Sequence, residues 1–270
     1  MRTAVIGASG YAGSELLRLC ATHPDLDVVV ATGESNAGRR VAEHVPALGA
    51  VYPTMVFAPT SAALNESVEV AFLALPHGQS QRLVPDLLER GVQVVDLGAD
   101  FRLKSAERYA TWYGEAHRTP ALLARAVYGL VERHRQELVG ATLIAAPGCY
   151  PTAASLALGP FLDRGVVEAS VVVVNALSGS SGAGRAVSER LHHSRLSGNA
   201  EAYGVLTHRH TPEIEQEIDA QVLFTPHLVP TSRGMLVTAY ARTSDSTFST
   251  AEALETTMLN YLSSRSRRGS

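Results

Sequence analysis

The sequence predicts an α/β protein in which a Rossmann-type, doubly wound parallel sheet is followed by an α+β catalytic and substrate domain. Two observations predict this fold class. In the first half of the chain, short β-branched runs alternate with helical patterns, which is typical of βαβ units. After Thr152 that alternation stops, and one apolar helix is followed mainly by β-like runs.

The elements of the first domain follow from these patterns. The helical stretch that begins at Gly13 carries Leu16, Leu17 and Cys20 on one face. We expect strands at residues 3–6, 28–31, 71–75, 92–96 and 143–146, with helices at 13–23 and 80–90 between them. The first domain therefore spans residues 1–148 and is expected to bind a dinucleotide.

The second domain is expected at residues 149–262. Its pattern indicates a helix at 153–161, strands at 171–174, 222–225 and 234–240, and a further helix from Ser249 onward. Residues 263–270 consist only of Ser, Arg and Gly, a composition that predicts a disordered end.

Composition excludes several classes of partner. The 270 residues include 46% hydrophobic residues and carry a formal charge of −3, so no basic excess is present to neutralise phosphates. We therefore expect neither nucleic acid nor a membrane surface as a partner, and a small molecule as the substrate. The start of the chain lacks a signal-peptide pattern and no apolar run approaches membrane-spanning length, which indicates a cytoplasmic protein. With only Cys20 and Cys149 present, disulfides are not expected.

The first strand leads into a glycine-rich turn of the form G-x-x-G-x-x-G. We expect Gly7 to permit the tight turn, Gly10 to let a pyrophosphate approach the backbone, and Gly13 to let the helix pack on the strand. The competing interpretation is a tight turn without a ligand. The predicted cofactor contacts here are Gly7, Ser9, Gly10, Tyr11, Ala12 and Gly13.

Two further segments bear on the cofactor. The second strand ends without an acidic residue for a free ribose hydroxyl, and Ser35, Arg39 and Arg40 follow it, which favours the 2′-phosphate of NADP. Glu34 in the same segment and an ordinary solvated loop are the opposing considerations. Pro76 and Gly78 follow the strand at 71–75 and are expected on the nicotinamide side of the cofactor.

Cys149 lies in the unusual run Ala146-Pro147-Gly148-Cys149-Tyr150-Pro151-Thr152, between a strand and the start of a helix. The positive end of that helix is expected to lower the pKa of the thiol and raise its thiolate fraction. A small buried cysteine, like Cys20 on its helix face, is the alternative. The sequence setting favours Cys149 as a covalent nucleophile.

A nucleophilic thiol requires an acid–base partner, and His208 and His210 lie where a loop enters a helix. The residues alone do not decide which histidine acts; Thr211 is expected to cap that helix, and Glu213 to orient an imidazole. A metal site formed with Cys149 is the alternative, but no further ligands stand at zinc spacing, so no metal is expected.

A second glycine-rich loop follows the strand at 171–174. Its backbone amides and Arg185 would suit an anionic substrate group, although a flexible surface loop would have the same composition. We expect Ser178, Gly179 and Arg185 to contact the substrate, and Ser180 and Gly182 the cofactor. Arg102 is a further substrate candidate, as is Arg233, with structural ion pairs as the alternative for both.

Taken together and in order, five motifs resemble the N-acetyl-gamma-glutamyl-phosphate reductase family, which is related to aspartate-semialdehyde dehydrogenase. The motifs are Gly7-Ala8-Ser9-Gly10-Tyr11-Ala12-Gly13, Ala99-Asp100-Phe101-Arg102, Pro147-Gly148-Cys149-Tyr150-Pro151-Thr152, Ser178-Gly179-Ser180-Ser181-Gly182-Ala183-Gly184-Arg185 and His208-Arg209-His210-Thr211-Pro212-Glu213. The resemblance covers nearly the whole chain.

The resemblance implies an NADPH-dependent, aldehyde-forming oxidoreductase of arginine biosynthesis that acts as a homo-oligomer, dimer or tetramer. It implies that a thiolate at Cys149 attacks the acyl phosphate and that hydride transfer reduces the resulting thioester. Two alternatives stay open: an aminoadipate-type acyl-phosphate reductase of lysine biosynthesis, and a non-catalytic NADP-binding protein. The family pattern continues beyond the position of Tyr261, so the second domain is expected to be incomplete at its C-terminus.

Overall fold

The computed structural model describes residues 1–244 and 251–266. The chain forms two compact units. The first consists of residues 1–109, 115–129 and 136–147, and the second of residues 110–114, 130–135 and the chain from 148 onward. Two short segments thus belong to the second unit although they lie inside the range 1–148 expected for the first domain.

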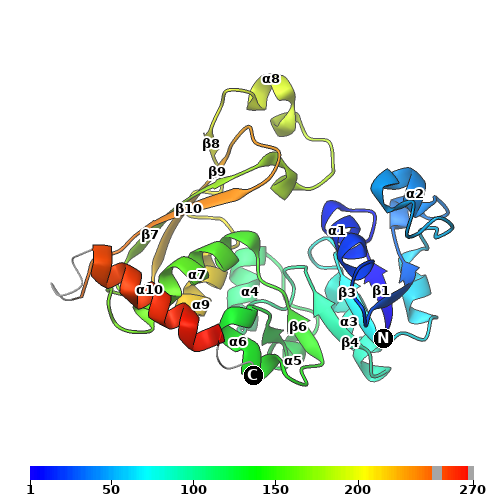
Figure 1. Ribbon diagram of the computed structural model, residues 1–270, viewed down its shortest axis with the longest axis horizontal. Helices are drawn as coiled ribbons and strands as arrows, with labels where there is room; N and C mark the ends of the chain where they lie inside the picture. The colour runs from blue at the N-terminus through cyan, green and yellow to red at the C-terminus, as the bar shows by residue number, and fades with distance from the viewer. Residues whose placement is uncertain (245–250, 267–270) are drawn as a thin grey trace. The chain divides into compact units, whose positions relative to one another are not determined.

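The first unit contains a six-stranded parallel sheet (Figure 1). Its strands are β1 (Arg2–Ile6), β2 (Asp27–Ala31), β3 (Val70–Leu73), β4 (Gln93–Asp96), β5 (Val127–Tyr128) and β6 (Leu143–Ala145). In space they follow the order β2-β1-β3-β4-β6-β5, so successive strands are added on one side of β1 and then on the other. The carboxyl ends of β1 and β3 therefore flank the position where such sheets bind ligands.

Both faces of this sheet are buried, as β1 shows residue by residue. Ala4 and Ile6 belong to one hydrophobic cluster, which includes Val84 and Leu87 of helix α3 (Ser80–Glu89). Val5 points to the other face and packs in a separate cluster with Leu17 of helix α1 (Tyr11–Cys20). Because both faces of the sheet are covered, the sequences of the strands are continuous runs of apolar residues. It also confirms the expected doubly wound architecture.

The helices in the first part of the chain are α1 (Tyr11–Cys20), α2 (Val41–His44), α3 (Ser80–Glu89), α4 (Ala106–Tyr113), α5 (Pro120–Leu123) and α6 (Val131–Leu138). Short 3₁₀ turns occur at Glu34–Asn36, Pro46–Leu48, Thr60–Leu64, Ser180–Ala183 and Glu189–Leu191. The expected helices at 13–23 and 80–90 correspond to α1 and α3. Helix α1 begins two residues and ends three residues earlier than expected, whereas α3 begins where expected and ends one residue earlier.

The second unit is built on a four-stranded mixed sheet in the order β10-β7-β9-β8. Its strands are β7 (Val172–Ser178), β8 (Glu201–Ala202), β9 (Val222–Leu228) and β10 (Met235–Tyr240), and its helices are α7 (Cys149–Leu162), α8 (His193–Leu196), α9 (Thr211–Ile218) and α10 (Ala251–Ser266). Helices α7 and α9 cover one face, where Ala154 and Ile214 pack against Val174 and Phe224 (Figure 1).

Two boundaries in the second unit differ from those expected. Helix α7 begins at Cys149 rather than at 153, because Gly148 takes the extended N-cap conformation and Pro151 is tolerated in a first helical turn. Helix α10 continues to Ser266, so the predicted disordered end is wrong for residues 263–266. The remainder of that predicted end, residues 267–270, lies outside the described residues.

Candidate active site

The turn between β1 and α1 requires glycine at two of its three glycine positions. A Cβ on Gly7, whose φ is +84°, would lie 2.3 Å from the carbonyl oxygen of Ala74, and one on Gly13 would lie 2.3 Å from that of Gly7. At Gly10 an added Cβ would meet only the Gly7 oxygen, at an ordinary 3.6 Å. Gly10 therefore borders open space, as expected for the place where a phosphate approaches the backbone.

Helix α1 begins beside that space with the features of an anion site. Gly10 is its N-cap, no side chain caps its first amides, and its first turn holds no acidic residue. The N–H groups of a helix start, together with the helix dipole, favour a negatively charged ligand. The turn thus fits the pyrophosphate of a dinucleotide.

The hydrogen bonding of Glu34 argues against a role for this residue in binding the ribose. Its carboxylate accepts a hydrogen bond from the backbone N–H of Thr60 at 2.9 Å, and hydrogen bonds from Thr60 lower the pKa of Glu34. Ser35, Arg39 and Arg40 are exposed in the same segment. The acidic residue that opposed an NADP site is therefore engaged elsewhere, while the candidate phosphate-binding groups face solvent.

Cys149 is exposed in the first turn of α7. The backbone beside it is held from α9, because the N–H of Gly148 donates a 2.7 Å hydrogen bond to Oε1 of Glu213. Glu213 is only 1% exposed. In addition, the N–H and the hydroxyl of Thr152 both donate to the carbonyl of Gly148 at 2.9 Å. The thiol therefore stands on a backbone whose position is fixed from two sides.

The loop that carries His208 and His210 packs against Tyr150, the residue that follows Cys149. The ring of Tyr150 packs edge-on against His208 and at a tilt against His210, with ring centroids 5.6 and 5.8 Å apart. The hydroxyl of Tyr150 lies 2.9 Å from that of Tyr203. Residues about 60 positions apart in the chain thus converge inside one unit, as the nucleophile and acid–base assignment requires.

The two histidines differ in their surroundings. His208 packs against Tyr150, Tyr203 and Phe224, and burial, assisted by the charge of Arg209, lowers its pKa to about 4. Its Nδ1 accepts a hydrogen bond from the backbone N–H of His210 at 3.1 Å, which places the ring hydrogen on Nε2. His208 is therefore a neutral ring that braces its own loop.

One expectation about the helix that follows is revised. Thr211 does not act as a cap: it is the first residue of α9, the N-cap position belongs to His210, and the Thr211 hydroxyl is buried without a hydrogen-bond partner. Glu213, which was expected to orient an imidazole, also accepts the hydrogen bond of Gly148 and so has a role at the cysteine turn. The sequence offers no signal for this contact, because it joins the N-cap residue of α7 to a side chain of α9.

The second glycine-rich loop is less open to an anion than its sequence suggests. The N–H groups of Gly179, Ser180 and Ser181 donate to the carbonyls of Gly234, Thr231 and Ser232. Those of Gly182 and Gly184 donate to carbonyls within the loop itself. Most of the amides expected to bind a substrate are thus already paired, whereas Arg185 is exposed. Ser178 is buried, with its hydroxyl bonded to the carbonyl of Gly179.

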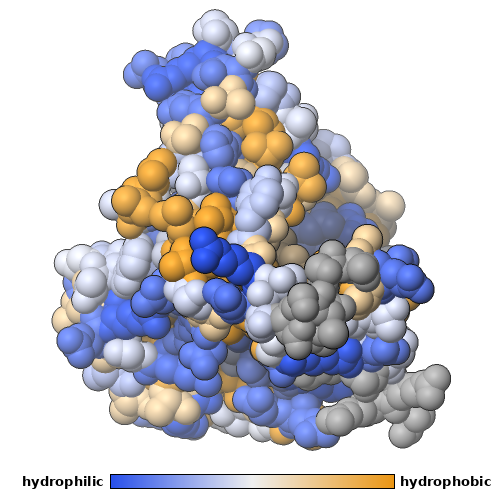
Figure 2. Space-filling view, turned by 90° about the vertical axis from the view of Figure 1, so that its left-hand side faces the viewer, coloured by the Kyte–Doolittle hydropathy of each residue, from blue (hydrophilic) through white to orange (hydrophobic). Residues whose placement is uncertain are grey.

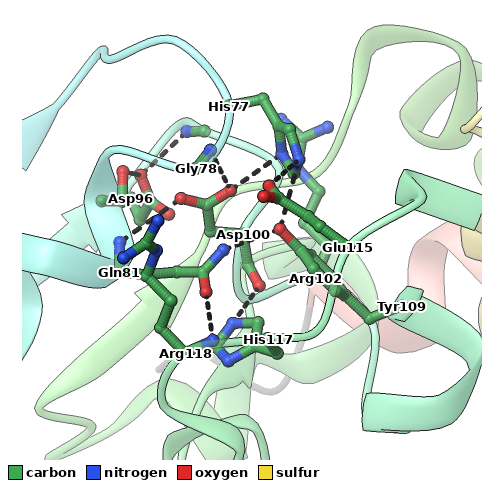
Figure 3. A network of polar contacts seen from close by, with 12 residues as sticks. His77, Gly78, Gln81, Asp96, Asp100, Arg102, Tyr109, Glu115, His117 and Arg118 are labelled. Carbon is green, nitrogen blue, oxygen red and sulfur yellow. Dashed lines mark hydrogen bonds and ion pairs between the residues drawn. The ribbon is translucent and has the colours of Figure 1, made fainter.

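Arg102 is an internal clamp in the first unit. It is 8% exposed, its Nε donates to the carbonyl of Ala146 at 2.9 Å, and its Nη2 donates to that of Leu97 at 2.8 Å. These bonds tie together the chain that leaves β4 and the chain that leaves β6. Pro76 and Gly78 follow β3 as expected, and a buried network of polar side chains lies beneath them (Figure 3).

Sequence reasoning missed several residues near these sites. Tyr150 and Tyr203 were not singled out, and the guanidinium of Arg190 lies 4.4 Å from the centre of the Tyr203 ring. Only Tyr150 carried a signal in the sequence, since it adjoins Cys149.

Among the described residues, no three His, Cys, Asp or Glu side chains gather in a way that would hold a metal ion. No helix in residues 1–244 or 251–266 has both the length and the apolar character needed to cross a membrane.

Comparison with known proteins decides the family. Residues 2–141 match the semialdehyde dehydrogenase NAD binding domain, and residues 149–265 match the semialdehyde dehydrogenase dimerisation domain. The chain is 44% identical over 248 residues to the N-acetyl-gamma-glutamyl-phosphate reductase of Magnetococcus marinus, covering 90% of this chain and 71% of that protein. The chain belongs to the N-acetyl-gamma-glutamyl-phosphate reductase family. It is thus an aldehyde-forming oxidoreductase of the semialdehyde dehydrogenase type, and the resemblance inferred from its motifs is confirmed.

Other relatives agree. The reductase of the same name from Symbiobacterium thermophilum is 45% identical over 253 residues, covering 89% of this chain and 71% of that protein. Among solved structures, the aspartate semialdehyde dehydrogenase of Candida albicans with NADP has a TM-score of 0.65 at 14% identity, covering 90% of this chain and 72% of that one. That of Francisella tularensis also scores 0.65, covering 97% and 80%. At such low identity these structures show the fold alone.

Proposed function

We propose that this chain reduces N-acetyl-gamma-glutamyl phosphate with NADPH to N-acetyl-L-glutamate 5-semialdehyde and inorganic phosphate, a step of arginine biosynthesis. One observation carries the proposal. An exposed thiol in the first turn of α7 adjoins Tyr150, whose ring contacts both histidines of the loop before α9. A nucleophile and an acid–base group are therefore available together, as covalent acyl transfer requires.

The chemistry follows from the thiol. The Cys149 thiolate attacks the carbonyl carbon of the acyl phosphate, the bond from that carbon to the phosphate oxygen breaks, and phosphate leaves with the electron pair. The thioester carbon would accept the hydride that NADPH supplies when bound, and its oxygen would accept a proton from the acid–base group, so that a thiohemiacetal forms on Cys149. When a base takes the hydroxyl proton of the thiohemiacetal, the carbonyl re-forms and the carbon–sulfur bond breaks. The aldehyde and the Cys149 thiolate are released.

We assign the acid–base role to His210. A general base is most effective when its pKa lies near the operating pH, and the partly buried His208, with a pKa of about 4, is a weak base there. His208 also uses Nδ1 to accept the N–H of His210, which suits it to hold the loop. Glu213 supports the site by fixing Gly148, next to the nucleophile. For the anionic groups of the substrate we propose Arg185, which is exposed.

The residues present fit NADP as the cofactor. Gly7, Gly10 and Gly13 shape the turn for a pyrophosphate, and Glu34 is bonded to Thr60 rather than placed to hold a ribose hydroxyl. Arg39 and Arg40 would bind the 2′-phosphate.

Replacing both Arg39 and Arg40 with Ala should raise the Kd for NADPH at least tenfold and leave the Kd for NADH within about twofold, measured by fluorescence titration. Equal losses for the two cofactors would contradict the 2′-phosphate role.

The activity is tested by phosphate-dependent oxidation of N-acetylglutamate semialdehyde, followed as NADPH absorbance. Cys149→Ser should lower kcat by at least about a thousandfold, because the hydroxyl is a far weaker nucleophile, while NADPH binding stays unchanged. Cys20→Ser is the matched control and should retain turnover, since Cys20 is buried on α1. Turnover retained by Cys149→Ser would refute the thioester route, and failure of the unaltered chain to use this aldehyde would refute the substrate.

We further propose that the chain forms homo-oligomers through the second unit, in line with its match to a dimerisation domain. The face of the second sheet opposite to α7 and α9, here called the open face, carries aligned apolar rows. Leu236 pairs with Leu177 across β10 and β7, and Tyr240 pairs with Val173, which pairs with Leu223 of β9. Figure 2 shows hydrophobic side chains gathered on the side of the molecule that it displays. A second copy of the chain would bury these rows.

A cytoplasmic location is also proposed. Neither Cys20 nor Cys149 forms a disulfide in the structure. A reducing compartment preserves such thiols, and a thioester mechanism depends on one of them.

A further inference from the structure

A fully buried carboxylate lies beneath the loop that joins β3 to α3. Asp100 is 0% exposed. Its Oδ1 accepts a 2.8 Å hydrogen bond from the N–H of Gly78, and its Oδ2 accepts a 3.3 Å bond from the N–H of Gln81. Nδ1 of His77 lies 2.9 Å from Oδ1 (Figure 3). One side chain therefore contacts His77 and Gly78 of the loop and Gln81 in the first turn of α3.

A second layer of contacts surrounds the partners of Asp100. Nε2 of His77 lies 3.2 Å from a carboxylate oxygen of Glu115 and 3.3 Å from the hydroxyl of Tyr109. That hydroxyl also accepts a 2.7 Å hydrogen bond from Nε2 of Gln81. His77 is thereby held on both sides of its ring. The direction in which the loop leaves β3 is set by groups from several separate segments of the first unit, as Figure 3 shows.

A buried carboxylate destabilises the folded state unless hydrogen bonds and opposite charge compensate for its lost hydration. What the protein gains is a single backbone conformation between Pro76 and Gln81, including a positive φ of +80° at Gly78. The loop stands at the carboxyl end of β3, beside β1, where the strand order reverses and ligands bind in such sheets.

We propose that Asp100 is a positioning residue for hydride transfer: through His77, Gly78 and Gln81 it holds the Pro76–Gly78 loop in the conformation that receives the nicotinamide ring. The inference rests on the proposed function, which places Pro76 and Gly78 at the nicotinamide. It assigns Asp100 no contact with the substrate or the cofactor. Its effect should therefore fall on the nicotinamide half of the cofactor alone.

The test compares two ligands of the full chain by titration calorimetry: NADPH, and 2′,5′-ADP, which lacks the nicotinamide. Asp100→Asn should weaken NADPH about tenfold, because it removes the charge that holds His77, and should leave 2′,5′-ADP within about twofold. His77→Asn, which keeps the Asp100 bonds to Gly78 and Gln81, should act in the same direction and guards against misfolding of the first variant. Asp86→Asn is the matched control, since it makes the same chemical change at an exposed carboxylate of α3 outside this network, and it should change neither ligand.

A second readout is the split between kinetic constants. In both Asp100→Asn and His77→Asn, kcat should fall while KM for phosphate stays within about twofold, since phosphate binding belongs to the second unit in the proposed mechanism. Equal weakening of NADPH and 2′,5′-ADP in both variants, or unchanged NADPH binding, would overturn the positioning role. Binding of neither ligand by the unaltered chain would refute the proposed cofactor instead, and with it the basis of this inference.

Discussion

The two cysteines of this chain differ in what surrounds their sulfur atoms. Cys20 is 4% exposed on the inner side of α1, and burial raises the pKa of its thiol. Cys149 is exposed in the first turn of α7, where a negative charge is favoured by the helix dipole. A sequence shows that both residues are thiols, but their reactivity depends on this difference in environment.

Chemical labelling checks that difference. With limiting iodoacetamide, Cys149 should be carboxymethylated at least about ten times faster than Cys20, because reaction requires an accessible thiolate. Peptide mass spectrometry measures the two rates in one sample, and Cys149→Ser controls for labelling of Cys20 alone. Preferential modification of Cys20 would remove the structural basis for Cys149 as nucleophile.

His208 gives a pH-dependent prediction for stability. Its pKa is lowered from 6.5 to about 4 by burial, so between these values the unfolded chain binds a proton that the folded chain does not. The contribution of His208 to the free energy of unfolding should therefore be constant above about pH 7 and decline as pH falls toward 4, by up to about 3 kcal/mol. Urea unfolding of the native chain and of His208→Asn across this range measures it. Parallel pH profiles for the two proteins would show that His208 is not responsible.

At the scale of elements, the β1–α1 turn separates steric from ligand-binding roles of glycine. Gly7 and Gly13 are required because a Cβ at either would overlap backbone atoms. Gly10 has room for a methyl group. The G-x-x-G-x-x-G pattern predicted the steric roles of Gly7 and Gly13 correctly, because a turn of a few residues is governed by local geometry that the sequence specifies. The role of Gly10 at a pyrophosphate stays a prediction.

Alanine substitutions at Gly13 and Gly10 test the distinction between steric and ligand-binding roles. Gly13→Ala should lower the free energy of unfolding by roughly 1–3 kcal/mol, since the new Cβ would lie 2.3 Å from the Gly7 oxygen. Gly10→Ala should leave stability unchanged but weaken NADPH at least about tenfold, because the methyl group would occupy the approach of the pyrophosphate. Thermal melts and fluorescence titration measure the two effects. A stable Gly13→Ala, or a Gly10→Ala with normal affinity, would contradict this division of roles.

The sequence patterns could not predict contacts between elements that are distant in the chain. Helix α7 was predicted from its apolar stretch, but its start at Cys149 depends on Gly148, whose N–H is bonded to Glu213 of α9. The short strands β5 and β8 were missed because two residues carry no detectable periodicity. Such features arise only when segments far apart in sequence are brought together by packing.

At the scale of the whole molecule, the second sheet has unequal faces. Val174 and Phe224 are buried under α7 and α9, whereas on the open face Leu236 is 60% exposed and Tyr240 59% exposed. Apolar rows of this kind on a soluble protein usually mark an interface. The match to a dimerisation domain points to a second copy of the chain as the partner.

Oligomeric state should therefore respond to a charge on that face. Leu236→Glu should shift the chain toward a monomer in light scattering coupled to size-exclusion chromatography, because a buried unpaired carboxylate opposes association. Val139→Glu is the matched control, since Val139 is 82% exposed in the first unit. An unchanged oligomer in Leu236→Glu, or a chain that is monomeric without substitution, would refute the open face as the interface.

The sequence by itself determined the doubly wound fold class, the glycine turn, the candidate nucleophile and the family resemblance. Each of these depends on local spacing or on residues adjacent in the chain. Only the tertiary structure decided that Glu213 holds the backbone at Gly148, that His208 is a partly buried neutral ring, and that Arg102 and the amides of the second glycine-rich loop are already bonded. Burial and hydrogen-bond partners are properties of packed neighbours, and neighbours in space are fixed only when the whole chain has folded.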